Sequence, residues 1–270
     1  MREVIQIIKA EIVKSHQINF GDKRNYFIVL LWPILLFFTA YYSYKPLSFS
    51  EAGWSIFESK EVIIKFLIIG YLAYNCFFSL VRNALFMRNE REEGVLEIIF
   101  LSPAKRFALM YGRALGTVIQ NVWMFGVFTA FILVYIGGFE KSTLLFFPLV
   151  FLLICISAGI WGGLLNTLFL FSRDTLVIFY LLDEPMLLFS GVKMPTAIFP
   201  FWAKVISFIF PITYVLYIAR GTLMSTETLY ELRGAFVALV LLLCIIIFTT
   251  SQLLRLAEAH YRKSGNINFY

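Results

Sequence analysis

Acidic side chains concentrate in one short stretch of an otherwise apolar chain, RNEREEGVLEIIFLSP at residues 88–103. Glu90, Glu92, Glu93 and Glu97 fall within it and are mixed with apolar residues. Carboxylates on a short apolar element can orient it against a basic partner while its apolar face docks. A plainer interpretation is a solvated loop, because charge runs are usually solvated faces. The stretch therefore predicts either a docking element or a loop that only maintains topology.

The apolar residues of this stretch follow the spacing of a short helix with a defined end. Leu96 and Phe100 share one helical face, and Ile99 belongs to a second apolar face. Ser102 is a favoured N-cap residue and Pro103 a favoured first helical residue, so the next helix starts there. We expect a short, rigid helix lying across the membrane face between two spans.

A second pair of acids, Asp183 and Glu184, lies inside an apolar run and is followed by Pro185. Acids at membrane depth are costly and mark a function by default. One interpretation is that they face a translocation path and attract a cationic substrate. The alternative is structural: they pair with a neighbour, become neutral, or lie beside water where the proline breaks the helix.

Aromatic side chains inside the apolar runs could line a path for a lipid-linked or glycan substrate. At helical spacing, however, such residues more often pack a core. The candidates are Phe77, Phe78, Trp123 and Trp161.

The sequence gives little sign of a metal site or of a catalytic nucleophile. The three cysteines lie in apolar runs without a C-x-x-C pair, and there are two histidines. No G-x-x-x-x-G-K-[ST] stretch occurs, so we expect no P-loop for nucleotide in this chain. A membrane enzyme is therefore a weak alternative.

The elements that position these residues are predicted to be transmembrane helices. The chain is 60% hydrophobic with a mean hydropathy of +0.81, and its apolar runs approach or exceed the roughly 20 residues that cross hydrocarbon. We predict an all-α integral membrane protein of one domain, residues 1–270. Its six spans are placed at residues 26–44, 62–86, 109–136, 144–171, 175–192 and 235–254.

Two regions outside the spans have their own patterns. Residues 1–24 form an amphipathic helix, expected to lie along the headgroup layer or, alternatively, to pack as a solvated helix on a partner. Residues 193–232 are apolar but contain Pro195, Pro200 and Pro211. Two short helices separated near Pro211, dipping into the membrane from one side, are expected there. Irregular backbone at that depth requires protein or water around it.

Basic residues predict the orientation. With both termini in the cytoplasm, 15 of the 23 Lys and Arg residues lie inside and 23 − 15 = 8 outside. The cytoplasmic membrane, with both termini inside, is therefore the expected location.

The order of the motifs resembles that of the permeases of type-2 ABC exporters. E-E-G-V-L-E-x-x-x-x-S-P, followed by K-R-x-x-x-x-x-G-R, is similar to the segment that joins the second and third spans in that family. The pattern S-G-V-x-M-P, F-P-x-W, F-P-I-T-Y and A-R-G, from Ser190 to Gly221, resembles the family's fifth span, outer re-entrant helices and hinge. The matching positions of the first motif are Glu93, Gly94, Leu96, Glu97, Ser102, Pro103 and Arg113.

The resemblance implies a role for each part. Residues 88–108 would hold the coupling helix that meets an ATPase subunit, and residues 193–232 would be outer re-entrant helices. ATP and Mg would be bound by two copies of that ATPase, not by this chain, and a second permease, identical or related, would complete the transporter. Lipid is the other expected partner, and no nucleic acid is expected. The expected cargo is an amphipathic drug or peptide antibiotic, or a lipid-linked polymer such as a polysaccharide or teichoic acid. A secondary transporter or channel stays as the alternative from another class.

Overall fold

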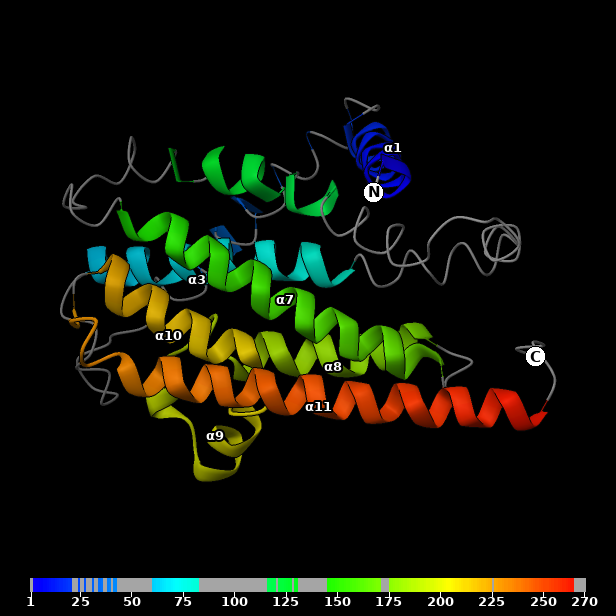
Figure 1. The fold of residues 1–270 in the computed structure, drawn as a ribbon. Coiled ribbons are helices and arrows are strands. Elements are labelled where there is room, and N and C mark those ends of the chain that lie inside the picture. Colours follow the sequence, from blue (N-terminus) through cyan, green and yellow to red (C-terminus); the bar gives the residue numbers. More distant parts are fainter. Residues whose placement is uncertain are drawn as a thin grey trace.

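The computed structural model describes residues 2–20, 60–82, 116–119, 121–127, 129–130, 145–170, 175–224 and 226–264, and isolated positions between 24 and 42. Within these ranges the chain is helical and has no strand, as predicted (Figure 1). The elements are α1 Arg2–Phe20, α3 Lys60–Arg82, α7 Phe146–Leu170, α8 Thr175–Phe189, the 3₁₀ turn η3 Thr196–Ile198, α9 Phe201–Ser207, α10 Pro211–Leu223 and α11 Arg233–Ser264.

Three described helices are long and apolar enough to cross a membrane: Val62–Arg82, Phe146–Phe169 and Arg233–Leu253. Their positions agree, within a few residues, with those predicted for the second, fourth and sixth spans. The predicted first and third spans lie largely outside the described residues. So does the predicted coupling region 88–108, which stays a prediction together with its ten candidate residues.

The predicted fifth span is shorter than expected. The helix α8 has 15 residues and ends at Phe189, whereas the sequence predicted helix to residue 192. Gly191 has a φ of 85°, a left-handed conformation that glycine adopts without the steric cost of a side chain. The chain therefore turns at Ser190–Gly191 instead of continuing the helix.

The broken helix pair predicted around Pro211 is present. The helices α9 and α10 are bent by 95° at the residues between them. Phe210 is extended, as expected before a proline, and Pro211 starts α10 at the position where its missing N–H costs nothing. The Thr213 hydroxyl donates to the Ser207 carbonyl at 2.8 Å, so a side chain satisfies the end of α9.

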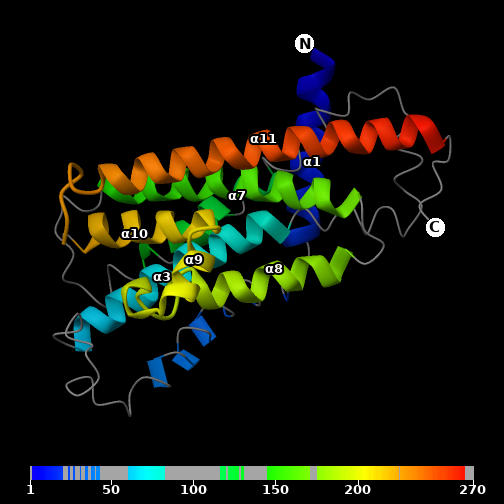
Figure 2. The same ribbon diagram turned by 90° about the horizontal axis from the view of Figure 1, so that it is seen from below.

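The helix α7 is the centre of the packing. It contacts α3, α10 and α11, while α10 also contacts α3 and α11 (Figure 2). The helix α3 is mostly buried, but α11 buries only a narrow stripe that includes Leu239, Leu243 and Ile246. Most of the remaining surface of α11 is apolar and exposed, which suits a helix that faces lipid or a second membrane subunit.

The arrangement has two distinct ends. The helices α3, α7 and α11 run in the same direction, and α8 returns between their ends, as the colours in Figures 1 and 2 show. The helix α10 begins part of the way along the bundle and ends beside the start of α11. The helix α1 runs across α11 instead of along it, as an interfacial helix would if α11 spans the membrane.

Candidate functional site

One buried polar contact joins α3 to α8. The Tyr74 hydroxyl donates a hydrogen bond of 2.9 Å to Oδ1 of Asp183, which is 9% exposed. The Phe78 ring stacks on Tyr74 with centroids 5.9 Å apart, and it contacts Phe179 of α8 at 5.7 Å. The predicted acid of the fifth span is therefore held by a tyrosine inside an aromatic cluster, which excludes water from one side of the carboxyl group.

The neighbouring acid has a different environment. Glu184 is exposed on α8, whereas Asp183 points into the bundle, since consecutive residues on a helix lie on different faces. The two carboxyl groups therefore do not lie together: one is inside the bundle and the other is on its surface. Only Asp183 has a protein partner suited to a buried acid, and Glu184 faces the exterior of this chain.

The four predicted aromatic residues do not form one lining. Phe77 and Trp161 are buried, and Trp161 packs edge-to-face on Phe210 with centroids 5.8 Å apart. Phe78 belongs to the cluster beside Asp183. Trp123 is 51% exposed on the surface of the described part of the chain. Phe77 and Trp161 thus serve the core, and of the four only Phe78 joins the environment of the acid.

A guanidinium that the sequence reasoning did not single out connects three elements. Arg220 of α10 donates to the carbonyl oxygens of Gly191 at 2.7 Å and Val192 at 3.0 Å. Its other contacts are the Phe66 carbonyl at 3.2 Å and the Phe66 ring, whose centroid lies 3.4 Å from the Arg220 Cζ. One side chain therefore fixes α10 to α3 and to the turn that follows α8.

Two glycines make this contact sterically feasible. A β-carbon on Gly70 would lie 2.5 Å from Nη2 of Arg220 and 2.5 Å from the Val192 carbonyl oxygen. Gly191 supplies the left-handed turn that presents its carbonyl to the guanidinium. The residues of this contact are visible in the sequence, since S-G-V and A-R-G belong to the motif from Ser190 to Gly221. Only the structure shows that the two ends of this motif bind each other.

The turn between α10 and α11 is held by carboxylates. Tyr217 donates to Oε1 of Glu227 at 2.8 Å. Glu231 accepts from the backbone N–H of Thr228 at 2.7 Å and from its hydroxyl at 2.9 Å. These bonds favour the charged form and lower the pKa of Glu231, the backbone bond most strongly. The pair resembles a capping box ahead of α11.

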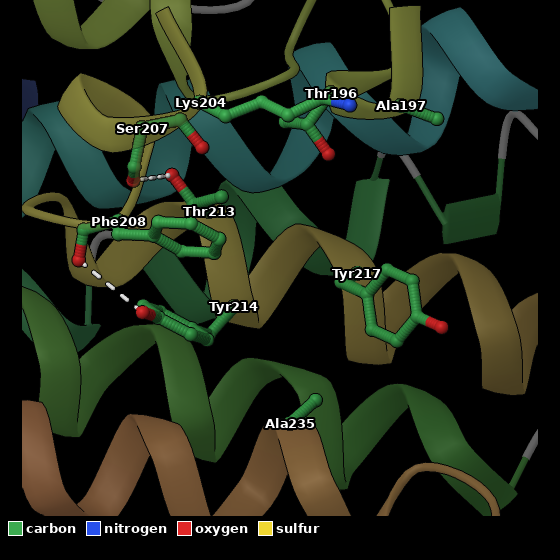
Figure 3. A pocket seen from close by; sticks show the side chains of 9 residues that line it. All are labelled: Thr196, Ala197, Lys204, Ser207, Phe208, Thr213, Tyr214, Tyr217 and Ala235. Atoms are coloured by element: carbon green, nitrogen blue, oxygen red, sulfur yellow. Dashed lines mark hydrogen bonds between the residues drawn. The ribbon is translucent and has the colours of Figure 1, made fainter. Parts of the chain in front are cut away.

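A pocket of about 300 Å³ lies between the broken pair and the start of α11 (Figure 3). Its walls come from α9, α10 and the first turn of α11, with two residues from η3. Apolar, hydroxyl and aromatic side chains share the lining with one lysine. The lining residues are Thr196, Ala197, Lys204, Ser207, Phe208, Thr213, Tyr214, Tyr217 and Ala235.

No group of three or more His, Cys, Asp or Glu side chains that could hold a metal ion occurs among the described residues. The described part of the chain therefore offers recognition and packing chemistry: a buried acid held by a tyrosine, a partly buried guanidinium on backbone carbonyls, and a pocket with a cation.

The apolar helices and the broken pair define an integral membrane protein. The ABC-2 type transporter family matches residues 8–224, which is most of the chain, and the chain belongs to that family. This confirms the family predicted from the two motifs, and the membrane chain of this family is a permease subunit.

A relative from Cyanophora paradoxa, which its name describes as a transport permease (ycf38), is 24% identical over 175 residues. The aligned part is 62% of this chain and 59% of that protein's length, so the chain spans less than two thirds of this relative. Its name agrees with transport by a membrane permease.

Proposed function

We propose that the chain is the membrane subunit of an ABC exporter. It moves an amphipathic drug, a peptide antibiotic or a lipid-linked molecule outward, with ATP hydrolysed by a separate subunit. The family match over most of the chain carries this proposal, because the matched region includes two of the three long apolar helices and the broken pair. Two ATPase copies would bind on the cytoplasmic side, and a second permease would complete the path.

The exposed apolar surface of α11 supports burial in lipid or against a second permease. Most of that helix would face water if this chain acted alone in solution, at a cost of about 25 cal/mol for each Å² of apolar surface. The common end of α3, α7 and α11 supports a cytoplasmic C-terminus, since Arg262 and Lys263 lie in the last turn of α11 and Arg82 ends α3.

The coupling region is tested by co-purification. The chain is expressed together with its genomic neighbours, and a P-loop ATPase is expected to co-purify with it in a fixed ratio. Glu93→Lys is expected to abolish this binding or to uncouple ATP hydrolysis from transport, because it reverses a charge in the predicted coupling helix. Glu140→Lys makes the same change in the predicted outer loop and should leave both unchanged.

A permease that purifies alone and transports without nucleotide would overturn the exporter proposal. Normal binding and transport by Glu93→Lys would instead remove the coupling role from residues 88–108 and leave the exporter proposal in place.

Asp183 is proposed to face the cargo in one transport state and to attract a cationic group there. The contact with Tyr74 suggests a clean test, because Asp183→Asn keeps an oxygen that can accept the tyrosine hydrogen bond while it removes the charge. Combined with Glu184→Gln, it should reduce the transport of cationic amphipaths more than that of neutral ones at equal expression. An unchanged profile would assign Asp183 to structure alone.

A further inference from the structure

The pocket between the broken pair and α11 contains a cation that the transport argument does not use. Of the nine residues that line it, Lys204 alone carries a formal charge. No hydrogen bond or ion pair joins its ammonium group to another residue in the described part of the chain. In Figure 3 the Lys204 side chain extends along one wall, and the rings of Phe208 and Tyr214 lie across from it.

Most of the other polar groups of the lining already form hydrogen bonds within the chain. The Thr213 hydroxyl donates to the Ser207 carbonyl, and the Tyr214 hydroxyl donates to the Phe208 carbonyl at 3.3 Å. The Tyr217 hydroxyl donates to Glu227, which is not part of the lining. The ammonium group of Lys204 thus remains the strongest available donor, and three N–H bonds suit a phosphate oxygen or a carboxylate.

Large aromatic side chains in and beside the pocket are exposed on the surface of the described part of the chain. Phe208, which follows α9 directly, lines the pocket and is 57% exposed, and Phe201 and Trp202 of α9 are 83% and 60% exposed. Tyr230, on the turn before α11, is also exposed. Tryptophan and tyrosine favour the boundary between hydrocarbon and water, which places the pocket near the headgroup layer. A volume of about 300 Å³ is at the small end of ligand pockets and is enough for part of a headgroup.

We propose that this pocket binds the headgroup of an acidic phospholipid. The phosphate lies on Lys204, and the glycerol and upper acyl chains run along Phe208, Tyr214 and Ala235. A lipid that bridges α9, α10 and α11 would hold the broken pair against the bundle. The site concerns the surrounding membrane and does not depend on the identity of the cargo.

Native mass spectrometry of the full chain in detergent tests this proposal, with phosphatidylglycerol as the probe and phosphatidylcholine of the same acyl chains as reference. Wild type is expected to retain phosphatidylglycerol in preference to phosphatidylcholine. Lys204→Gln should weaken this retention roughly tenfold, since a charge-assisted hydrogen bond is lost. Lys193→Gln is the matched control, because Lys193 is a nearby, partly buried lysine outside the lining, and it should bind as wild type.

A second variant fills the pocket without changing its charge. Ala235→Leu should also reduce phosphatidylglycerol retention, because the larger side chain occupies the volume of the lipid. Equal retention by wild type and Lys204→Gln, or an equal loss in Lys193→Gln, would overturn the site. So would displacement of the bound lipid by millimolar inorganic phosphate, which would indicate a free-anion site. These outcomes measure lipid retention and do not test ATPase binding or transport. A failed lipid site would therefore leave the proposed function in place.

Discussion

Arg220→Met tests whether the guanidinium holds α10 to α3 and to the turn that follows α8. Methionine keeps an unbranched apolar stem against the Phe66 ring and removes the donors to Gly191 and Val192. The Phe66 carbonyl lies inside α3, where helical bonding already satisfies it, so its bond to Arg220 adds little. Two hydrogen bonds from a charged donor are therefore the main loss.

Each such bond contributes about 1.5–3 kcal/mol to the free energy of unfolding, so the expected loss is about 3–6 kcal/mol. At about 2 °C for each kcal/mol in a chain of this size, the melting temperature should fall by about 6–12 °C. Arg220→Lys should recover only part of this, because one ammonium cannot reproduce the planar fork that reaches both carbonyls.

The melting temperature is measured on the full chain in one detergent, by the loss of the monodisperse peak after heating. Arg233→Met is the matched control: Arg233 is exposed, and its Cζ lies 4.0 Å from the centroid of the Tyr230 ring. Its loss should cost about 0.5–1 kcal/mol, or about 1–2 °C. Equal shifts for the two methionine variants would refute the argument that Arg220 fixes α10 to α3 and to the turn after α8.

Three further outcomes are expected. Gly70→Ala should lower the free energy of unfolding by about 1–3 kcal/mol, and with it the melting temperature, since the added β-carbon would lie 2.5 Å from a nitrogen and an oxygen. Gly159→Ala is the control: its β-carbon would have no atom within 4 Å, so the change should be neutral or stabilising by up to about 1 kcal/mol. Tyr74→Phe leaves a buried acid without its donor and should cost about 1–3 kcal/mol by the same assay, whereas Tyr230→Phe, on the surface, should cost almost nothing. The stabilisation from Glu231, whose pKa is lowered in the folded chain, should be present at neutral pH and disappear as the pH falls below the ordinary glutamate pKa of about 4.3. The protection factors of the amides in the turn before α11, which correct for the intrinsic pH dependence of hydrogen exchange, should fall over this range in wild type and stay constant in Glu231→Gln. Protection factors in wild type that stay the same between neutral and acidic pH would contradict it.

The elements were largely predictable because their signals are local. Apolar length alone indicates α3, α7 and α11, and Pro211 alone indicates the break between α9 and α10. The end of α8 was predicted three residues too late, because the apolar run continues past the turn at Gly191. Residues 190–192 are apolar or small in sequence, yet the chain turns there and presents its carbonyls to a distant arginine.

The candidate site was predictable only in part. An acid inside a span was visible in the sequence, but its partner Tyr74 is 109 residues away and carries no pattern of its own. Asp183 and Glu184 are equivalent in the sequence and separate in space, since a helix turns adjacent residues to different faces. Trp161 and Phe77 are aromatic residues of the kind that could line a substrate path. In the structure, however, both are buried in the core.

The sequence by itself determined that this is a helical membrane permease, because hydropathy and the order of local motifs need no knowledge of which helices touch. The tertiary structure decided the rest: the Tyr74–Asp183 contact, the Arg220 junction that closes the motif from Ser190 to Gly221, and the pocket around Lys204. Each depends on the distance between side chains on different helices, and those distances follow from how the helices pack around α7.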